Sequence, residues 1–193
     1  MQGRNVAGIA APMPYEPPPE LASLSLAEIA AQVAARKLPP LDQWAPASEG
    51  ISEMRIAADG RWYHQGGLIT RPSMVRAFAS LLMRDAADRH WLVTPHEKLS
   101  IEVEDAAFIA VDVTQESGAL AFRLNTDDIV LAGPDHPIIA RGDPDLPALY
   151  VAVRHGTEAR LNRSTYGQLV EIALDQGSLS VTSQDQTFAL VPQ

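Results

Sequence analysis

Much of the chain alternates between apolar and polar residues with a period of two, which is typical of strands that bury one face. The clearest examples are 99–104 and 120–124, and shorter apolar runs occupy 129–131, 138–140 and 149–153. Prolines and turn-forming residues separate these runs. Because the strands are spaced as hairpins and outnumber the helical segments, the pattern predicts an α+β fold with antiparallel sheets and packed helices.

The N-terminal part of the chain predicts an arm followed by a helix. Residues 1–20 are rich in proline and offer little apolar surface to bury, so we expect a mobile arm there. Ser25 is followed three residues later by Glu28, and this spacing predicts a capping box. The helix that starts there should end before Pro39.

A weak internal repeat follows. A helix predicted from Pro72 to Arg84 leads to a strand at 91–95, and a helix that begins near Arg163 leads to a strand at 179–183. When the two helices are aligned on their arginines, their apolar faces share one register, which indicates an internal duplication. The prediction divides the chain into an arm at 1–20, an N-terminal α+β domain at 21–99 and a C-terminal α+β domain at 100–193. A seam between two such units is a natural place for a ligand.

Composition narrows the classes of function. The 193 residues carry a formal net charge of -9, which argues against duplex nucleic acid and against anionic membrane surfaces as partners. The chain has no cysteine, so disulfides and thiolate metal sites are excluded and a cytoplasmic location is favoured. No apolar run approaches the length of a membrane span.

The first candidate for chemistry is the polar stretch from Thr94 to Lys98, which is followed by Asp105. It contains His96 and Glu97, which could serve acid–base catalysis or bind a metal. Neighbouring residues of an extended segment point to opposite faces, however, so a solvated strand end is the better interpretation. The spacing of the histidines suits no zinc site, and we predict neither a metal nor a cofactor.

The second candidate contains Arg154, Glu158, Arg160 and Arg163, at the entrance of the predicted third helix. Guanidinium groups and helix N-termini both favour phosphate or carboxylate. The alternative is a set of salt bridges to acids such as Asp105 that hold the two domains in register. Both interpretations stay open, because an arginine that clamps a seam can exchange its partner for a ligand.

Several motifs together resemble the bacterial domain of unknown function family 1285. They are Gly60-Arg61-Trp62-Tyr63-His64, Ile69-x-Arg71, Leu92-Val93-Thr94-Pro95-x-Glu97-Lys98, Ile101-x-Val103-Glu104-Asp105-Ala106-x-Phe108 and Val153-Arg154-x-Gly156-x-Glu158-Ala159-Arg160-Leu161-x-Arg163. The resemblance implies two α+β domains from an internal duplication, with a C-terminal domain similar to a pleckstrin-homology barrel. It also implies a ligand of nucleotide type at the domain interface and a part in signalling.

We therefore expect a non-enzymatic module that binds a small anionic or nucleotide-like ligand between its domains. Arg71, Arg154, Arg160 and Arg163 would contact the anion, and Thr94 would donate a hydrogen bond to it. Glu97, Lys98, Asp105 and Glu158 would orient the arginines. One alternative is a hydrolase with Glu97 or Asp105 as general base and His96 as proton carrier. A second alternative is a domain that binds a protein partner through its sheet.

Overall fold

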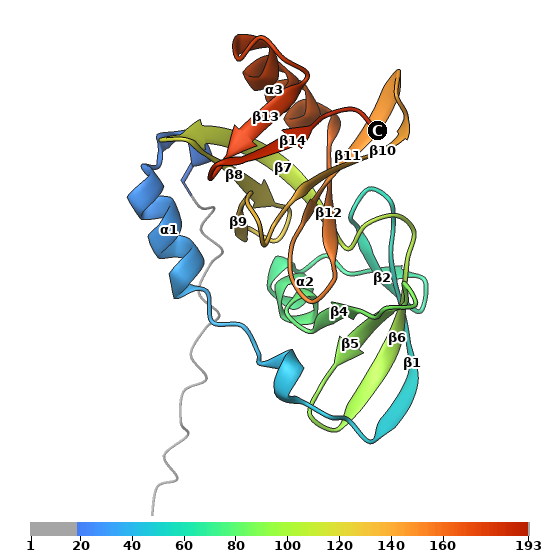
Figure 1. Cartoon of the computed structure of the whole chain (residues 1–193). Coiled ribbons are helices and arrows are strands. Elements are labelled where there is room, and N and C mark those ends of the chain that lie inside the picture. Colours follow the sequence, from blue (N-terminus) through green and yellow to red (C-terminus); the bar gives the residue numbers. More distant parts are fainter. Residues whose placement is uncertain (1–18, 193) are drawn as a thin grey trace, which may run out of the picture.

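The computed structural model describes residues 19–192 and contains two six-stranded sheets, one above the other in Figure 1. The first sheet consists of β1 (Ser48–Ile56), β2 (Trp62–His64), β3 (Gly67–Leu68), β4 (Leu82–Arg84), β5 (His90–Val93) and β6 (Glu97–Val103). The second consists of β7 (Phe108–Glu116), β8 (Ala119–Leu124), β9 (Ile129–Leu131), β10 (Ile138–Asp143), β11 (Leu146–Ala152) and β12 (Glu158–Leu161). The helices are α1 (Leu26–Ala35), α2 (Pro72–Ala79) and α3 (Arg163–Asp175), with short 3-10 helices η1 (Leu21–Ser23) and η2 (Leu41–Gln43). A hairpin of β13 (Ser180–Ser183) and β14 (Gln186–Ala189) completes the described chain.

Both sheets have the same connectivity. Each contains two three-stranded antiparallel units, joined by a parallel pair between the first and the last strand, which are β1 with β6 and β7 with β12. The sheets are therefore mixed, whereas the sequence predicted antiparallel ones, because pairing between distant strands leaves no local signal. Neither sheet closes on itself, since β3 and β4 end the first and β9 and β10 end the second. The predicted barrel is thus not confirmed.

The helices occupy different places in this shared connectivity. Along the chain, α2 connects β3 to β4, which are the two edge strands of the first sheet, whereas α3 comes after all six strands of the second sheet. The predicted strand at 91–95 corresponds to β5, which is the second strand after α2, but β13 follows α3 directly. Aligning the two helices therefore does not match equivalent elements. The likeness of the domains lies in their strand order instead.

α2 is shorter than the sequence predicts. It ends at Ala79, and the residues up to Arg84 form β4 instead of a further helical turn. Leu82 is fully buried and pairs with Leu92 of β5, so the ladder to β5 and the core outweigh the local helical pattern.

The two domains share one core. The chain passes from β6 to β7 between Val103 and Phe108, so the predicted division after Leu99 falls within β6. We call β1–β6 with α2 the N-terminal domain and β7–β14 with α3 the C-terminal domain. One cluster of buried side chains runs through both and includes Trp62 of the first and Phe122 of the second.

Residues 19–38, which we call the N-terminal segment, pack on the outer face of the second sheet (Figure 1). Leu21 and Ile29 have no exposed surface and contact Ala121 of β8. All six residues of β8 are consequently buried, although its alternating sequence predicts burial of one face only. The guanidinium of Arg123 anchors the start of the segment by donating to the carbonyl of Pro19 at 2.8 Å.

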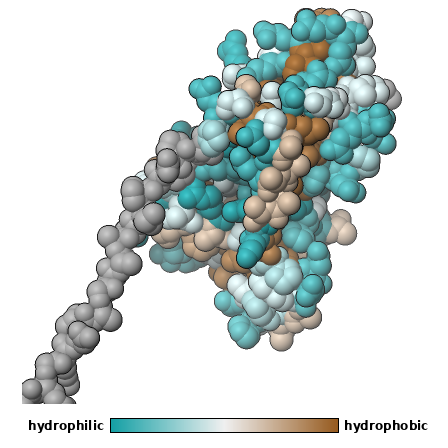
Figure 2. Space-filling view, turned by 90° about the vertical axis from the view of Figure 1, so that its left-hand side faces the viewer, coloured by the Kyte–Doolittle hydropathy of each residue, from teal (hydrophilic) through white to brown (hydrophobic). Residues whose placement is uncertain are grey.

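The surface on the side of α1 is mainly hydrophilic, with apolar residues confined to narrow bands (Figure 2). Among the described residues, no helix is long and apolar enough to cross a membrane. The mobile arm predicted at 1–20 lies outside the described residues, except for its last two positions.

Candidate ligand sites at the domain seam

The turn between β11 and β12 docks on β4 across the domain seam. The backbone amide of Arg84 donates a hydrogen bond to the carbonyl of His155 at 2.9 Å. Gly156 has a φ of +75°, and a Cβ atom there would lie 2.7 Å from the carbonyl oxygen of Arg84. Glycine is required because other residues avoid this φ and a methyl group would collide with backbone. This turn sets how the C-terminal domain sits on the first sheet.

Glu158 is the centre of an ion-pair network across this seam. Its carboxylate accepts two hydrogen bonds from Arg141, at 2.7 and 2.6 Å, and two longer ones from Arg84, both at 3.4 Å. Burial alone would raise the pKa of Glu158, but the hydrogen bonds and charges of the two arginines hold it below its usual value. The Glu158 carboxylate is therefore ionised and holds a cation from each domain. Nearby, burial and the charge of Arg84 lower the pKa of His90.

Tyr150 extends the network to Asp105. The guanidinium of Arg141 lies 4.7 Å from the ring centroid of Tyr150, and the Tyr150 hydroxyl donates to Asp105 at 2.7 Å. Arg160 donates to the other carboxylate oxygen of Asp105, also at 2.7 Å. Burial, followed by the hydrogen bond to Asp105, raises the pKa of Tyr150. The predicted residues Asp105, Glu158 and Arg160 thus lie in one network, with the ion pairing that the second interpretation expected.

Arg154 belongs to a different group on the same seam. It donates to Asp128 at 3.3 Å and to the carbonyl of Ala79 in α2 at 3.2 Å, and its guanidinium lies 4.9 Å from the ring centroid of Phe108. Asp128 also pairs with Arg36 of the N-terminal segment at 2.6 Å. Burial is the main reason why the pKa of Arg154 is lowered, and the charge of Arg36 adds to this effect, while the pairing with Asp128 opposes it. Two cations therefore share one buried carboxylate.

A pocket of about 770 Å³, which we call the α3 pocket, opens where the first turn of α3 faces the β1–β2 turn. Its polar lining includes Arg160, Asn162 and Arg163, and its apolar lining includes Val111 and Leu146. Arg163 is exposed and has no ion-pair partner among residues 19–192. The side chain of Asn162 caps α3 by accepting from the Thr165 amide at 2.8 Å. The predicted placement of Arg163 at a helix entrance is confirmed.

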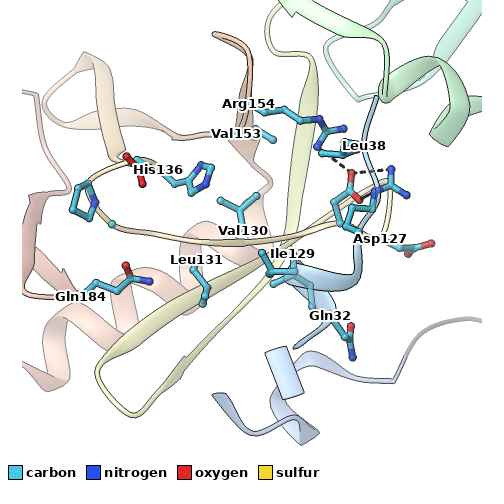
Figure 3. A pocket seen from close by; sticks show the side chains of 16 residues that line it. Gln32, Leu38, Asp127, Ile129, Val130, Leu131, His136, Val153, Arg154 and Gln184 are labelled. Atoms are coloured by element: carbon cyan, nitrogen blue, oxygen red, sulfur yellow. Dashed lines mark hydrogen bonds and ion pairs between the residues drawn. The ribbon is translucent and has the colours of Figure 1, made fainter. Parts of the chain in front are cut away.

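A second pocket of about 370 Å³, which we call the α1 pocket, lies between the end of α1 and the strand β9. Arg154 lies at one end of it and His136 and Gln184 at the other, with Val130 and Leu131 between them (Figure 3). Nδ1 of His136 is 3.0 Å from the carbonyl oxygen of Ala152. Because a carbonyl only accepts, this contact places the proton on Nδ1 and leaves Nε2 as an acceptor.

The remaining predicted residues lie away from these pockets. Thr94 closes the turn between β5 and β6, where its Oγ1 donates to the carbonyl of Glu97 at 2.9 Å. Lys98 pairs with Glu49 at 2.6 Å and lies 4.5 Å from the ring centroid of Trp91. This turn is at the far end of β6 from the C-terminal domain, roughly 20 Å along the strand. The expected convergence of Thr94, Glu97 and Lys98 with the seam arginines is therefore wrong.

The residues of the hydrolase alternative do not lie together, and Arg71 lies outside both pockets. His96 and Glu97 are both exposed in this distant turn, whereas Asp105 is paired at the seam. Arg71 is the exposed N-cap residue of α2 and lines neither pocket. Within residues 19–192, no three histidine, aspartate or glutamate side chains lie together in a way that could hold a metal.

The family model for the N-terminal domain of the domain of unknown function DUF1285 matches residues 39–106, and the model for the C-terminal domain of the DUF1285 protein of unknown function matches 107–190. The chain belongs to the DUF1285 family. The resemblance inferred from the motifs is thereby confirmed. No curated protein matches the chain.

Two crystal structures of DUF1285 proteins are similar to this one. The protein from Silicibacter pomeroyi DSS-3 is 37% identical, with a TM-score of 0.70, over 84% of this chain and 94% of its own. The protein from Shewanella baltica OS155 is 24% identical, with a TM-score of 0.52, over 63% of this chain and 92% of its own, and shows the fold alone. The α3 pocket is lined by both DUF1285 domains, whereas the α1 pocket takes one wall from residues 32–38, which precede them.

Sequence reasoning missed several residues of the DUF1285 seam. Arg84 falls in the predicted helix, Tyr150 falls in a predicted strand without a role, Arg141 follows the predicted strand at 138–140, and Asp128 falls in a predicted turn. The turn from Asn125 to Asp128 gave no signal of burial, because its cover comes from the N-terminal segment and from Arg154, both far away in sequence.

Proposed function

We propose that this protein is a binding module for a small anionic ligand of about the size of a nucleotide, and that the ligand occupies the α3 pocket. The observation that carries the proposal is Arg163. It is an exposed guanidinium without an ion-pair partner in residues 19–192, and it lines a pocket to which both domains contribute. In a chain with a net charge of -9, an arginine left without an acid calls for an explanation.

The polar end of the pocket suits an anion. Arg163 stands at the first position of α3, where the leading backbone amides have no acceptor within the helix and the helix dipole favours negative charge. Arg160 adds a second guanidinium, which Asp105 holds at 2.7 Å. A phosphate or carboxylate group could thus accept from two arginines and from helix amides together.

The rest of the pocket suits an apolar ring. Ile109, Val111 and Leu149 line one wall, and the tip residue Leu146 is 82% exposed beside them. Tyr166 contributes an aromatic ring from the next turn of α3. A volume of about 770 Å³ lies within the range of pockets that hold drug-sized ligands. The combination favours a ligand that carries an anion at one end and a ring at the other, such as a nucleotide.

Binding without catalysis is favoured because the residues of the hydrolase alternative do not converge. A module of this kind would act in regulation or signal transduction, by reporting the ligand through the domain seam or to a protein partner. The absence of cysteine supports a cytoplasmic setting. The shared strand order of the two sheets supports an origin by duplication, and the helix after the last strand of the second sheet supports a distant likeness to the pleckstrin-homology fold.

A thermal-shift screen of the full chain against mono-, di- and cyclic nucleotides and pyrophosphate tests the proposal, because a ligand that binds only the native state raises the apparent stability. Arg163→Lys should weaken the best ligand by about tenfold or more, since the planar two-pronged contact is lost while the charge is kept. Arg71→Lys is the matched control, because Arg71 is also an exposed arginine at a helix entrance. Equal loss in both variants, or no loss in Arg163→Lys, would overturn the proposal.

A further inference from the structure

Two guanidinium groups at one end of the α1 pocket share a single buried carboxylate. Arg36 and Arg154 both contact the carboxylate of Asp128, whose side chain is 7% exposed. The Arg154 side chain is 13% exposed, and its Nε is buried without a hydrogen-bond partner among the described residues. A desolvated guanidinium is costly unless its donors and its charge are satisfied. One positive charge in this group is therefore left without a counter-ion.

The other acids on the wall do not supply that counter-ion. Asp127 pairs with Arg76 at 2.9 Å, so its charge is already balanced. Asp135 lies exposed on the loop that follows β9. The single positive charge left over in the group of Arg36, Arg154 and Asp128 could therefore be balanced by one anionic group with a single negative charge. A dianion such as phosphate would bring a second negative charge close to Asp127 and Asp128, which like-charge repulsion disfavours.

The middle and the far end of the pocket define the rest of the ligand. Val130 of β9 lies between Arg154 and His136, and its neighbours Ile129 and Leu131 add to the apolar lining (Figure 3). The pocket is about 370 Å³, which is near the lower end for small-molecule sites. Nε2 of His136 offers an acceptor at the far end. A ligand that fits carries an anion at one end, a short apolar body, and room for one donor at the other end.

We propose that the α1 pocket is a second ligand site and that it binds a small monocarboxylate with an aliphatic body. The carboxylate binds between Arg36 and Arg154, and the aliphatic body lies along β9. The site is independent of the α3 pocket, with which it shares no lining residue. Because Gln32, Val33 and Arg36 belong to the N-terminal segment, the bound carboxylate also holds that segment against the second sheet.

The test adds hexanoate to the full chain. Binding is measured by NMR chemical-shift titration and by hydrogen exchange of residues 26–38. Hexylamine and inorganic phosphate are the matched controls for charge and for shape. We expect saturable binding of hexanoate alone, with slower exchange in α1. Arg36→Gln removes the extra cation but keeps the pair of Asp128 with Arg154, and it should weaken hexanoate about tenfold or more.

Two further variants test whether hexanoate binds in the α1 pocket and not elsewhere. Val33→Trp fills the pocket from a side chain that is 38% exposed, so it should block hexanoate without disturbing the core. Arg163→Lys, in the other pocket, should leave hexanoate binding unchanged. Equal binding of hexanoate and hexylamine, no saturation by hexanoate, or unchanged affinity in Arg36→Gln would each overturn the proposal. Loss of nucleotide binding in Arg163→Lys with hexanoate binding intact separates this site from the proposed function.

Discussion

Replacing Gly156 with alanine tests whether the β11–β12 turn fixes the domain seam. The new methyl group would lie 2.7 Å from the carbonyl oxygen of Arg84, and no side-chain rotation can relieve a contact with backbone. Gly142 supplies a matched control, because it has a similar φ of +87° but nothing within 4 Å of its would-be Cβ atom. The difference between the two variants isolates the close approach from the cost of the φ angle.

The magnitudes follow from these contacts. An alanine at positive φ costs about 1–2 kcal/mol, and the loss of flexibility in the unfolded chain returns about 0.4–1 kcal/mol, so Gly142→Ala should cost about 0–1.5 kcal/mol. In Gly156→Ala the turn must also retreat from β4. Overpacking adds about 1–3 kcal/mol, and weakening the hydrogen bond from Arg84 to His155 adds about 0.5–1.5 kcal/mol. Gly156→Ala should therefore be less stable than Gly142→Ala by about 1.5–4.5 kcal/mol.

Urea unfolding of both variants measures this difference. All three tryptophans, Trp44, Trp62 and Trp91, lie before the C-terminal domain, so their fluorescence reports the N-terminal part, while circular dichroism reports the whole chain. If the seam couples the domains, the two probes coincide in the wild type and separate in Gly156→Ala. Equal stability of the two variants would refute the reasoning.

Two other predictions concern the N-terminal segment and the ion-pair network. Ile29→Ala should cost about 2–4 kcal/mol and expose α1 to proteases, whereas Val33→Ala, at a position 38% exposed, should change the free energy of unfolding by less than about 0.5 kcal/mol; equal protease sensitivity would contradict the docking of α1. The folded-state pKa of Glu158 is lowered, so its ionised form adds stability above the unfolded value of about 4.3, and this is lost as the pH falls through the folded pKa. Glu158→Gln should therefore reduce the fall of the urea midpoint with decreasing pH below about 4.3. An unchanged pH dependence in this range would show that the network adds no stability.

Local signals in the sequence predicted local structure well. Ser25 and Glu28 form the expected capping box, in which the Ser25 amide donates to Glu28 at 2.8 Å and the Glu28 amide donates to Ser25 at 3.3 Å. Asp59 and Gly60, a pair typical of hairpin turns, lie in the turn that joins β1 to β2. Arg71 has the extended backbone expected of a residue before proline. Each of these features is decided by contacts within a few residues.

Features that depend on distant contacts could not be predicted. The parallel pairs β1–β6 and β7–β12 join strands that are far apart in the chain, and alternation along one strand does not identify its neighbour. Asp128 lies in a predicted turn, but it pairs with both Arg36 and Arg154, which are distant in the chain, and is buried. Thr94 and Glu97 match the family motif, yet they shape a turn instead of joining the seam. The sequence predicted which residues were unusual better than it predicted where they meet.

The position of the N-terminal segment has a consequence during synthesis. Ile29 packs on Ala121, which follows it by about 90 residues, and ribosomes add about 5–20 residues per second. The segment is therefore made several seconds before its docking surface exists. Until β8 and β9 emerge, the apolar side of α1 has no partner within the nascent chain and is a site where a chaperone could bind. The time for which α1 stays undocked should then depend more on how fast the second sheet is translated than on the stability of α1 itself.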